Sequence, residues 1–262
     1  MNHYLGVDIG SLSCDAVLIG DDEKMLASSV FPTGANNRVA IERAIGEVLK
    51  ITGLSKTDIK ALVSTGYGRD RVPERLASVT EITCHARGIQ ALFPDTRVLI
   101  DIGGQDSKAI FFDDAGLVAD FAMNDKCAAG TGRFLEAMAR ALQLDIGEMI
   151  DLDLGVEGKI TLSSMCTVFA ESEVVSLIAD GVDVREIVHG LNSAIASRTV
   201  SLVKRIVPNP DGMTIAMSGG VARNNGVVRA LEAALGVSIA VPVEPDTVGA
   251  FGAALFARQR ST

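Results

Sequence analysis

Strand-like apolar runs alternate with segments of helical periodicity along the chain, beginning with three strands. Residues 4–19, YLGVDIGSLSCDAVLI, consist of two apolar runs interrupted at Gly10-Ser11, a pattern typical of a β-hairpin. The segment MLASSVFPTG predicts a third strand, which the proline and glycine near its end terminate. Residues 38–51 then carry apolar side chains at helical spacing, and Gly53 ends the helix.

The rest of the chain repeats this alternation. Apolar runs predict strands that begin at Ile59 and Arg97 and others over residues 109–112, 159–164, 213–220 and 238–243. Helical spacing predicts helices over residues 81–93, 133–142, 167–181, 184–207, 226–236 and 247–258. Because strands and helices alternate throughout, the predicted fold class is α/β.

Composition and charge narrow the class of protein. The 262 residues suit one large domain or two small ones, and the formal net charge of −9 argues against nucleic-acid binding through phosphates. No run of about 18 or more apolar residues occurs, so we expect no membrane span. The start, MNHYLGVDIG, lacks the features of a signal peptide. We therefore expect a cytoplasmic protein whose four cysteines are thiols or metal ligands.

The opening hairpin has a second copy near the middle of the chain. Residues 6–10 (GVDIG) align with residues 99–103 (LIDIG), and residues 16–17 then fall opposite residues 109–110 without a gap. An alternative is that two strand-turn-strand pieces resemble each other by chance. We interpret the repeat as a duplication, which predicts two related lobes that each begin with a hairpin.

Each hairpin turns at a D-x-G motif, Asp8-Ile-Gly10 in the first and Asp101-Ile-Gly103 in the second. A glycine turn exposes backbone N–H groups that bind anions, and it lets a phosphate approach closely. A carboxylate beside the turn can hold the Mg²⁺ that accompanies ATP. Two such hairpins would clamp a triphosphate, with Asp8 and Asp101 flanking the metal and Gln105 orienting the attacking water. The alternative role of the two aspartates is to stabilise the turns.

A third glycine turn completes the predicted nucleotide site. Gly219-Gly220 end an apolar run where the pattern changes from strand to helix. We expect this turn to offer a third backbone surface, directed towards the nucleoside. The three turns together predict an ATP-binding protein.

Two of the four cysteines stand at predicted helix starts. Cys127 precedes a glycine-rich helix start, and Cys166 lies where a predicted strand gives way to a helix. Helix N-termini favour thiolates and anionic clusters, and a two-fold symmetric dimer would provide four thiolates for a 4Fe-4S cluster. Two alternatives stay open: both cysteines are buried apolar residues, or all four cysteines of one chain hold a cluster. Cys84 and His85, in helix 81–93, are assigned to the core, as is Cys14.

A series of short motifs spans essentially the whole chain in the order VDIGS, TGYGR, EITCHA, IDIGGQDSK, NDKCAAGTGRF, SSMCTVFAESEV, SGGVARN and GAFGAALFA. In this order they resemble the activators of 2-hydroxyacyl-CoA dehydratases, which belong with the ATPase subunits of benzoyl-CoA reductases. The blocks NDKCAAGTGRF and CTVFAESEV are specific, whereas the D-x-G hairpins are shared by the wider superfamily. The resemblance implies the actin, sugar-kinase and heat-shock-protein ATPase fold, with two duplicated lobes and a nucleotide cleft between them.

The resemblance also implies roles for individual residues. Cys127 and Cys166 match the ligands of a 4Fe-4S cluster shared by the two subunits of a homodimer. ATP and Mg²⁺ would be bound by Gly10, Ser11, Leu12, Ser13 and Cys14 of the first hairpin, by Gly103 and Gly104 of the second, and by Gly219, Gly220, Val221 and Asn224. Lobe I would comprise residues 1–94 and the C-terminal helix 248–262, and lobe II residues 95–247.

The activity that the resemblance implies is an ATPase coupled to electron transfer. ATP would change the angle between the helices that follow the two cysteines, and a low-potential electron would pass from a ferredoxin or flavodoxin donor to a partner dehydratase. Three alternatives stay open: a reductase of another iron–sulfur partner, of the double-cubane or benzoyl-CoA reductase type; an acceptor kinase of the sugar-kinase type; and a nucleotide-sensing regulator. The acyl-CoA substrate would bind the partner, so this sequence does not identify it.

The first hairpin departs from the family pattern. Family members often read GSTxSK or GSTxTK at this turn, whereas the chain reads GSLSCD. Cys14 therefore replaces a hydroxyl residue, and Asp15 replaces a basic one. This change removes one possible phosphate contact and leaves the strength of ATP binding and the subfamily open.

Overall fold

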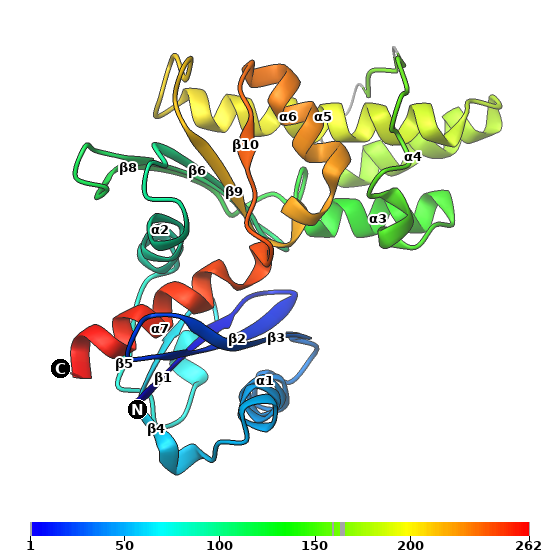
Figure 1. The fold of residues 1–262 in the computed structure, drawn as a ribbon. Coiled ribbons are helices and arrows are strands. Elements are labelled where there is room, and N and C mark those ends of the chain that lie inside the picture. The colour runs from blue at the N-terminus through cyan, green and yellow to red at the C-terminus, as the bar shows by residue number, and fades with distance from the viewer. Residues whose placement is uncertain (1, 159, 163–165, 262) are drawn as a thin grey trace. The chain divides into compact units, whose positions relative to one another are not determined.

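The computed structural model describes residues 2–158, 160–162 and 166–261 (Figure 1). The chain divides into two compact units, which are described one at a time. Unit 1 contains residues 1–96, 114–118 and 242–262, and unit 2 contains residues 97–113 and 119–241. The two lobes expected from the sequence remain a proposal.

Unit 1 is built on a sheet whose described strands have the order β3-β2-β1-β4-β5. β1 pairs antiparallel with β2 and parallel with β4, and β2 pairs antiparallel with β3. The strands are β1 (His3–Ile9), β2 (Ser13–Gly20), β3 (Met25–Pro32), β4 (Ile59–Thr65) and β5 (Ala77–Ser78). The α-helices are α1 (Asn37–Thr52), α2 (Glu81–Leu92) and α7 (Val248–Ser261), and the 3₁₀ helices are η1 (Lys56–Asp58), η2 (Arg69–Arg71) and η5 (Pro245–Thr247).

Different helices cover the two faces of this sheet. Leu5, Val7 and Ile9 of β1 pack with the apolar face of α1, whereas Tyr4 packs in a second cluster with α7. The alternation arises because successive side chains of a strand point to opposite faces. Figure 1 shows α1 and α7 on opposite sides of the sheet. Asp8, which lies between Val7 and Ile9, therefore points to the α7 face.

Glycines allow α7 to approach its neighbours in unit 1 closely. A β-carbon at Gly6 would lie 1.9 Å from the Ala250 carbonyl oxygen, and one at Gly252 would lie 1.8 Å from the Cys84 carbonyl oxygen. Backbone atoms of two packed elements cannot move aside as the end of a flexible side chain can. The glycines of the motif GAFGAALFA therefore determine how closely α7 packs on β1 and α2.

Gly252→Ala is expected to lower the free energy of unfolding by about 3 kcal/mol, because the added methyl group forces α7 away from α2. Gly46→Ala is the matched control: Gly46 lies inside α1, and a β-carbon there would meet nothing within 4 Å. The control should stabilise the protein by about 0.5–1 kcal/mol, since alanine favours a helix more than glycine does. Urea denaturation of both variants measures the difference. An unchanged midpoint for Gly252→Ala would contradict the close approach.

Unit 2 is built on a second sheet, whose described strands have the order β10-β9-β6-β7-β8. β6 pairs antiparallel with β7 and parallel with β9. The strands are β6 (Val98–Ile102), β7 (Ser107–Phe112), β8 (Val118–Asn124), β9 (Ile215–Ser218) and β10 (Ile239–Ala240). The α-helices are α3 (Gly132–Leu142), α4 (Thr167–Ala179), α5 (Val184–Lys204) and α6 (Asn225–Leu235), and the 3₁₀ helices are η3 (Ile146–Met149) and η4 (Gly220–Arg223).

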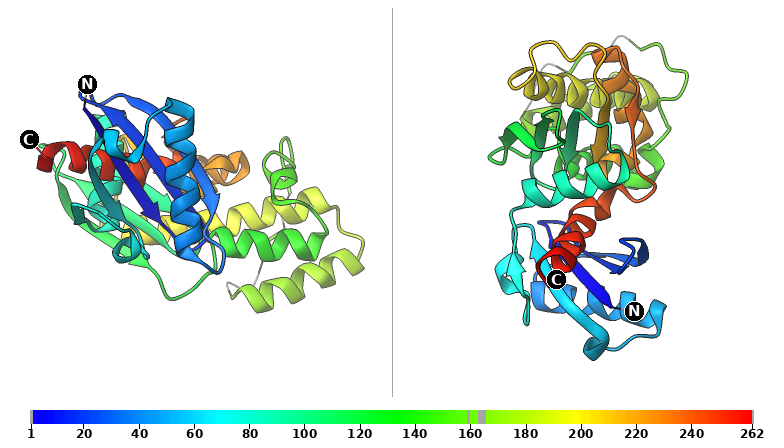
Figure 2. Two further views of the ribbon diagram at one scale, coloured as in Figure 1. Left: turned by 90° about the horizontal axis from the view of Figure 1, so that it is seen from below. Right: turned by 60° about the vertical axis from the view of Figure 1, so that its left-hand side comes forward.

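The helices of unit 2 share one hydrophobic core with its sheet. Phe134 of α3, Val174 of α4 and Leu191 of α5 belong to the same cluster as Ile100 and Ile102 of β6. Figure 2 shows α3, α4 and α5 running side by side. Of the helices in the described part of the chain, none has the length and apolar character that a membrane span requires.

Most predicted elements are confirmed, including both hairpins, the third strand and the helix over residues 38–51. The strand predicted over 159–164 is wrong at residues 160–162, and Lys159, Ser163 and Ser164 lie outside the described residues. The Ile160 carbonyl oxygen would lie 2.9 Å from a β-carbon at Gly190, so this segment packs on α5 rather than in a sheet.

Two further strands differ from expectation. The strand predicted over 238–243 is reduced to β10, because Pro242 lacks the N–H group that a ladder needs. β8 was not predicted, and its side chains are mostly exposed, so the sequence shows no alternation that marks it.

Candidate functional site

The turn of the first hairpin is fixed by its own backbone and by the residue that follows β3. The Gly10 N–H donates to the Ser13 carbonyl at 2.8 Å, and the Thr33 hydroxyl and N–H donate to the carbonyls of Gly10 and Leu12 at 2.9 and 2.8 Å. Ser11 and Leu12 form the tip and are half-buried. The predicted phosphate-binding residues therefore lie on a restrained turn, except for Cys14, whose side chain is buried in the core.

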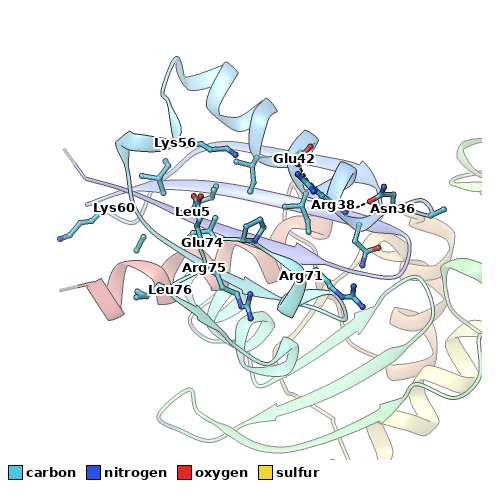
Figure 3. A pocket seen from close by; sticks show the side chains of 18 residues that line it. Leu5, Asn36, Arg38, Glu42, Lys56, Lys60, Arg71, Glu74, Arg75 and Leu76 are labelled. Atoms are coloured by element: carbon cyan, nitrogen blue, oxygen red, sulfur yellow. Dashed lines mark hydrogen bonds and ion pairs between the residues drawn. The ribbon is translucent and has the colours of Figure 1, made fainter.

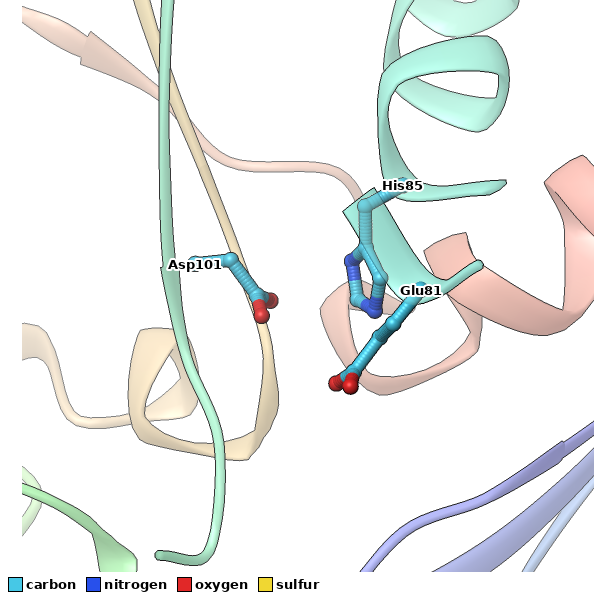
Figure 4. Close-up of side chains that lie close together, drawn as sticks. All are labelled: Glu81, His85 and Asp101. Atoms are coloured by element: carbon cyan, nitrogen blue, oxygen red, sulfur yellow. The ribbon is translucent and has the colours of Figure 1, made fainter. Parts of the chain in front are cut away.

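Asp8 lies at the end of β1 and is closely surrounded in unit 1. Its Oδ2 atom is 3.5 Å from Nε2 of His85. A β-carbon at Gly249, in the first turn of α7, would lie 2.1 Å from Oδ2, and one at Gly66 would lie 2.2 Å from Oδ1. His85 is 3% exposed and lies on α2 one helical turn after Glu81 (Figure 4). The expected core position of His85 is confirmed, but its contact with Asp8 was missed.

Asp15 lies opposite Asp8 in the β1–β2 pair. It is 4% exposed, and its Oδ2 atom accepts a hydrogen bond from the Ser13 hydroxyl at 3.0 Å. Burial, and then the negative charge of Asp8, raise the pKa of Asp15 well above the usual value for aspartate. The same position in the second hairpin is occupied by Lys108, which lies opposite Asp101.

Asp101 in the second hairpin is fully paired within unit 2. It is 1% exposed, and its Oδ1 atom accepts a hydrogen bond from the Ser218 hydroxyl at 2.7 Å. The Lys108 Nζ atom lies 3.1 Å from Asp101 Oδ2 and 2.7 Å from Asp106 Oδ2. Figure 4 shows the side chain of Asp101. Gln105, in the turn that follows β6, is exposed. The carboxylate of Asp101 is thus held rigidly at the end of β6.

The turn of the second hairpin is bonded to the start of α3. The carbonyl oxygen of Gly103 accepts from the Gly132 N–H at 3.0 Å, and that of Gly104 accepts from the Arg133 N–H at 2.9 Å. The Thr131 hydroxyl lies 3.0 Å from the Gly104 oxygen and 2.6 Å from the Ala128 oxygen, so these two acceptors share its one proton. Thr131 is fully buried. The sequence did not single out Thr131, and nothing in the motif separates it from an ordinary helix N-cap.

The third glycine turn lies beside Asp101. Gly219 has φ +85°, and a β-carbon there would lie 2.3 Å from the Ile102 carbonyl oxygen and 2.9 Å from Asp101 Oδ1. Only glycine fits both the angle and the space. Gly220 is exposed, and the Asn224 side chain caps α6 by accepting from two backbone N–H groups. The structure thus brings Gly219 to Asp101, while Asn224 and Val221 are occupied in local packing.

The four cysteines differ in exposure. Cys166 is exposed and is the N-cap of α4, and Cys127 is half-buried shortly before α3. Burial raises the pKa of Cys14 and raises the pKa of Cys84 to about 12, so both remain neutral thiols. Accessible thiols at helix N-termini suit an iron–sulfur cluster, whereas buried thiols do not. The two predicted ligands therefore fit a cluster that takes two thiolates from each chain.

A separate groove of about 1250 Å³ lies in unit 1 (Figure 3). Positively charged side chains of Arg38, Lys56, Lys60, Arg71 and Arg75 line it together with two glutamates. Among the described residues that line it, none belongs to the predicted nucleotide or cluster site. The groove is therefore not part of either site.

Comparison with known proteins gives relatives along the whole chain. An activator of lactoyl-CoA dehydratase from Anaerotignum propionicum is 46% identical over 255 residues, which are 97% of this chain and 97% of that protein. The activator of the 2-hydroxyisocaproyl-CoA dehydratase from Clostridium difficile, solved with bound ADPNP, is 41% identical and has a TM-score of 0.93 over 99% of this chain and 95% of that chain. The resemblance to dehydratase activators is thus confirmed.

The fold and the family follow from two further matches. A ROK family glucokinase from Streptomyces griseus is only 14% identical, with a TM-score of 0.57 over 98% of this chain and 100% of that chain, and shares the fold alone. The predicted sugar-kinase type of ATPase fold is therefore confirmed. The family model described as the BadF/BadG/BcrA/BcrD ATPase family matches residues 5–257. The chain belongs to the BadF/BadG/BcrA/BcrD ATPase family.

Proposed function

We propose that this ATPase is an activator of a 2-hydroxyacyl-CoA dehydratase. It would act in the cytoplasm as a homodimer, take an electron from a ferredoxin or flavodoxin, and deliver it to the dehydratase at the expense of ATP. Two similar proteins are activators of dehydratases, which supports a dehydratase as the partner. The exposed Cys166 supports a cluster site that a second subunit can complete.

In this proposal the two hairpins and the third glycine turn bind the nucleotide. The turn residues 10–14 and 103–104 would line the phosphates, which would be bound by those backbone N–H groups that are not already bonded within the turns, and residues 219–224 would contact the nucleoside. Asp8 and Asp101 would hold Mg²⁺, and Gln105 would orient the attacking water. The buried and restrained position of Asp101 supports its role, because a preorganised charge need not reorient during the reaction.

Cys127 and Cys166 would hold a 4Fe-4S cluster together with the same two residues of the second subunit. Such a cluster supplies one-electron chemistry at low potential. The N-terminus of α4, which Cys166 caps, contributes a partial positive charge that stabilises the Cys166 thiolate. The shared hydrophobic core of α3 and α4 keeps both helix starts in one packed layer.

The observation that carries the proposal is the hydrogen bonding between the second hairpin turn and α3. The three bonds to the carbonyl oxygens of Gly103 and Gly104 tie a predicted phosphate-binding turn to the helix that follows Cys127. A change in the turn on phosphate binding would therefore reach the cluster ligand through α3. A tenfold effect on the cluster requires a difference of about 1.4 kcal/mol in nucleotide affinity between two conformations.

The test measures whether nucleotide changes the cluster. In anaerobically purified protein, ATP should speed iron removal by a chelator about tenfold relative to ADP and shift the reduction potential. Thr131→Val removes the hydroxyl that Gly104 shares with Ala128, a loss of about 1 kcal/mol, and should reduce the ATP effect from about tenfold to about twofold while ATP still binds. Thr199→Val is the control, because the buried Thr199 hydroxyl bonds only within α5, to Ile195.

Two results would reject the proposal. Equal chelation rates and potentials in the nucleotide-free, ADP-bound and ATP-bound states would leave a static electron carrier beside an unrelated ATPase. Colourless, iron-free protein after anaerobic purification would instead favour an acceptor kinase or a nucleotide sensor.

A further inference from the structure

Three neighbouring side chains on the sheet of unit 1 each carry a buried oxygen without a hydrogen-bond partner. Asp8 of β1 is in register with Asp15 of β2 and with Thr65 of β4. Paired residues of adjacent strands project from the same face of a sheet, about 5 Å apart, so the three side chains form one row. Asp8 Oδ1, Asp15 Oδ1 and Thr65 Oγ1 have no hydrogen-bond partner among the described residues.

These side chains are almost completely buried. Asp8 is 6%, Asp15 4% and Thr65 0% exposed. The Cys84 thiol lies near Thr65 but does not meet hydrogen-bond geometry. Among the described residues, no lysine or arginine pairs with Asp8 or Asp15, and His85 faces Asp8 at its other oxygen, Oδ2. Two adjacent buried carboxylates cost several kcal/mol, roughly, unless a cation or a proton compensates one of the charges.

The corresponding row in unit 2 contains that positive group. Asp101 of β6 is in register with Lys108 of β7 and with Ser218 of β9. Lys108 pairs with one carboxylate oxygen of Asp101, and the Ser218 hydroxyl donates to the other. Each row thus has an aspartate at its centre and a hydroxyl residue on one side. They differ at the third position, where unit 1 has Asp15 and unit 2 has an ammonium group.

We infer that the row of unit 1 binds a divalent cation in the position that Lys108 fills in unit 2, and that Asp15 makes this possible. The ligands would be the carboxylates of Asp8 and Asp15 and the hydroxyl of Thr65. All three are hard oxygen donors, the set that Mg²⁺ and Mn²⁺ prefer, and the two carboxylates match a double positive charge. The site uses residues of unit 1 alone, so it binds its cation without nucleotide. It shares Asp8 with the proposed Mg²⁺ site of ATP but adds Asp15 and Thr65, and cation binding without nucleotide does not depend on the proposed electron transfer.

The test is Mn²⁺ binding to the full-length protein without nucleotide. Free Mn²⁺, followed by its electron paramagnetic resonance signal, should decrease by one ion per chain in the wild type. Asp15→Asn keeps the shape of the side chain and should weaken this binding at least tenfold; Thr65→Val should weaken it severalfold. Asp22→Asn is the control, because Asp22 is an exposed carboxylate in the turn that follows the same strand, and it should bind Mn²⁺ as the wild type does.

Asp15→Lys provides an independent readout. It recreates the lysine of unit 2 and should abolish Mn²⁺ binding, while the melting temperature no longer rises when Mn²⁺ is added. If wild type and Asp15→Asn bind Mn²⁺ equally, or if neither binds it, the inference is wrong. The second outcome would assign the missing positive charge to His85 or to a proton on Asp15. If the Asp15 variants fail to fold, comparing Mn²⁺ binding by Thr65→Val with that by Asp22→Asn still tests the site: weaker binding by Thr65→Val alone supports it, and equal binding contradicts it.

Discussion

Cys127→Ser and Cys166→Ser are each expected to lower the iron content to less than about a tenth of the wild-type value. Each substitution would remove two of four thiolates from a cluster shared in a homodimer, because both subunits carry it. Serine is a poor ligand for iron at this kind of site, because iron–sulfur clusters prefer soft thiolate ligands. Iron and sulfide content and the visible absorption spectrum, measured anaerobically, report the loss.

Cys84→Ser is the matched control for this experiment. Cys84 is fully buried, and its raised pKa keeps it a neutral thiol, so it should not contribute to a cluster. The control should keep its iron and its spectrum even if it is less stable. Full iron in Cys127→Ser would remove Cys127 from the ligand set. Loss of iron in all three variants would point instead to a cluster within one chain.

Local sequence patterns predicted the hairpins because the two halves of each carry strong apolar runs around a glycine turn. The same patterns failed where tertiary contacts decide the structure. Residues 160–162 look like a strand but pack on α5 at Gly190, and β8 is a strand although most of its side chains are exposed. In both cases the neighbour that determines the conformation lies far away in the sequence, where periodicity gives no information.

In the candidate site, too, local motifs predicted some residues, whereas contacts between distant strands could not be predicted. The D-x-G motifs predicted Asp8 and Asp101, since the motif and its chemistry are contiguous in sequence. The sequence could not predict that Thr65 lies beside Asp8, because that depends on the register of β1 and β4. The acidic residue Asp15 was visible in the sequence as a departure from the family pattern, but its contrast with Lys108 required the register of the second hairpin. The hydrogen bonds then showed that the row of unit 1 has oxygens without a partner, whereas in unit 2 Lys108 and Ser218 pair both oxygens of Asp101.

Asp101→Asn is expected to lower the ATPase rate by about 100-fold, a loss of about 2.7 kcal/mol of transition-state stabilisation. Asparagine keeps the size of the side chain and can still accept the hydrogen bond from Ser218. It lacks the charge that holds Mg²⁺, so ATP should still bind but turn over slowly. Single-turnover hydrolysis and nucleotide affinity, measured separately, distinguish the two effects.

Loss of the ion pair with Lys108 could lower the rate without any role for Asp101 in metal binding, and Asp106→Asn separates these explanations. Asp106 contacts the same ammonium group at 2.7 Å, so either substitution removes one carboxylate from Lys108 and should reduce stability by about 1–3 kcal/mol. Only Asp101→Asn removes the carboxylate from the end of β6. We therefore expect Asp106→Asn to lose less than about tenfold in rate while losing similar stability. If both variants lose the same activity, the Lys108 network rather than the Asp101 carboxylate limits hydrolysis, and the assignment of Asp101 to Mg²⁺ is wrong.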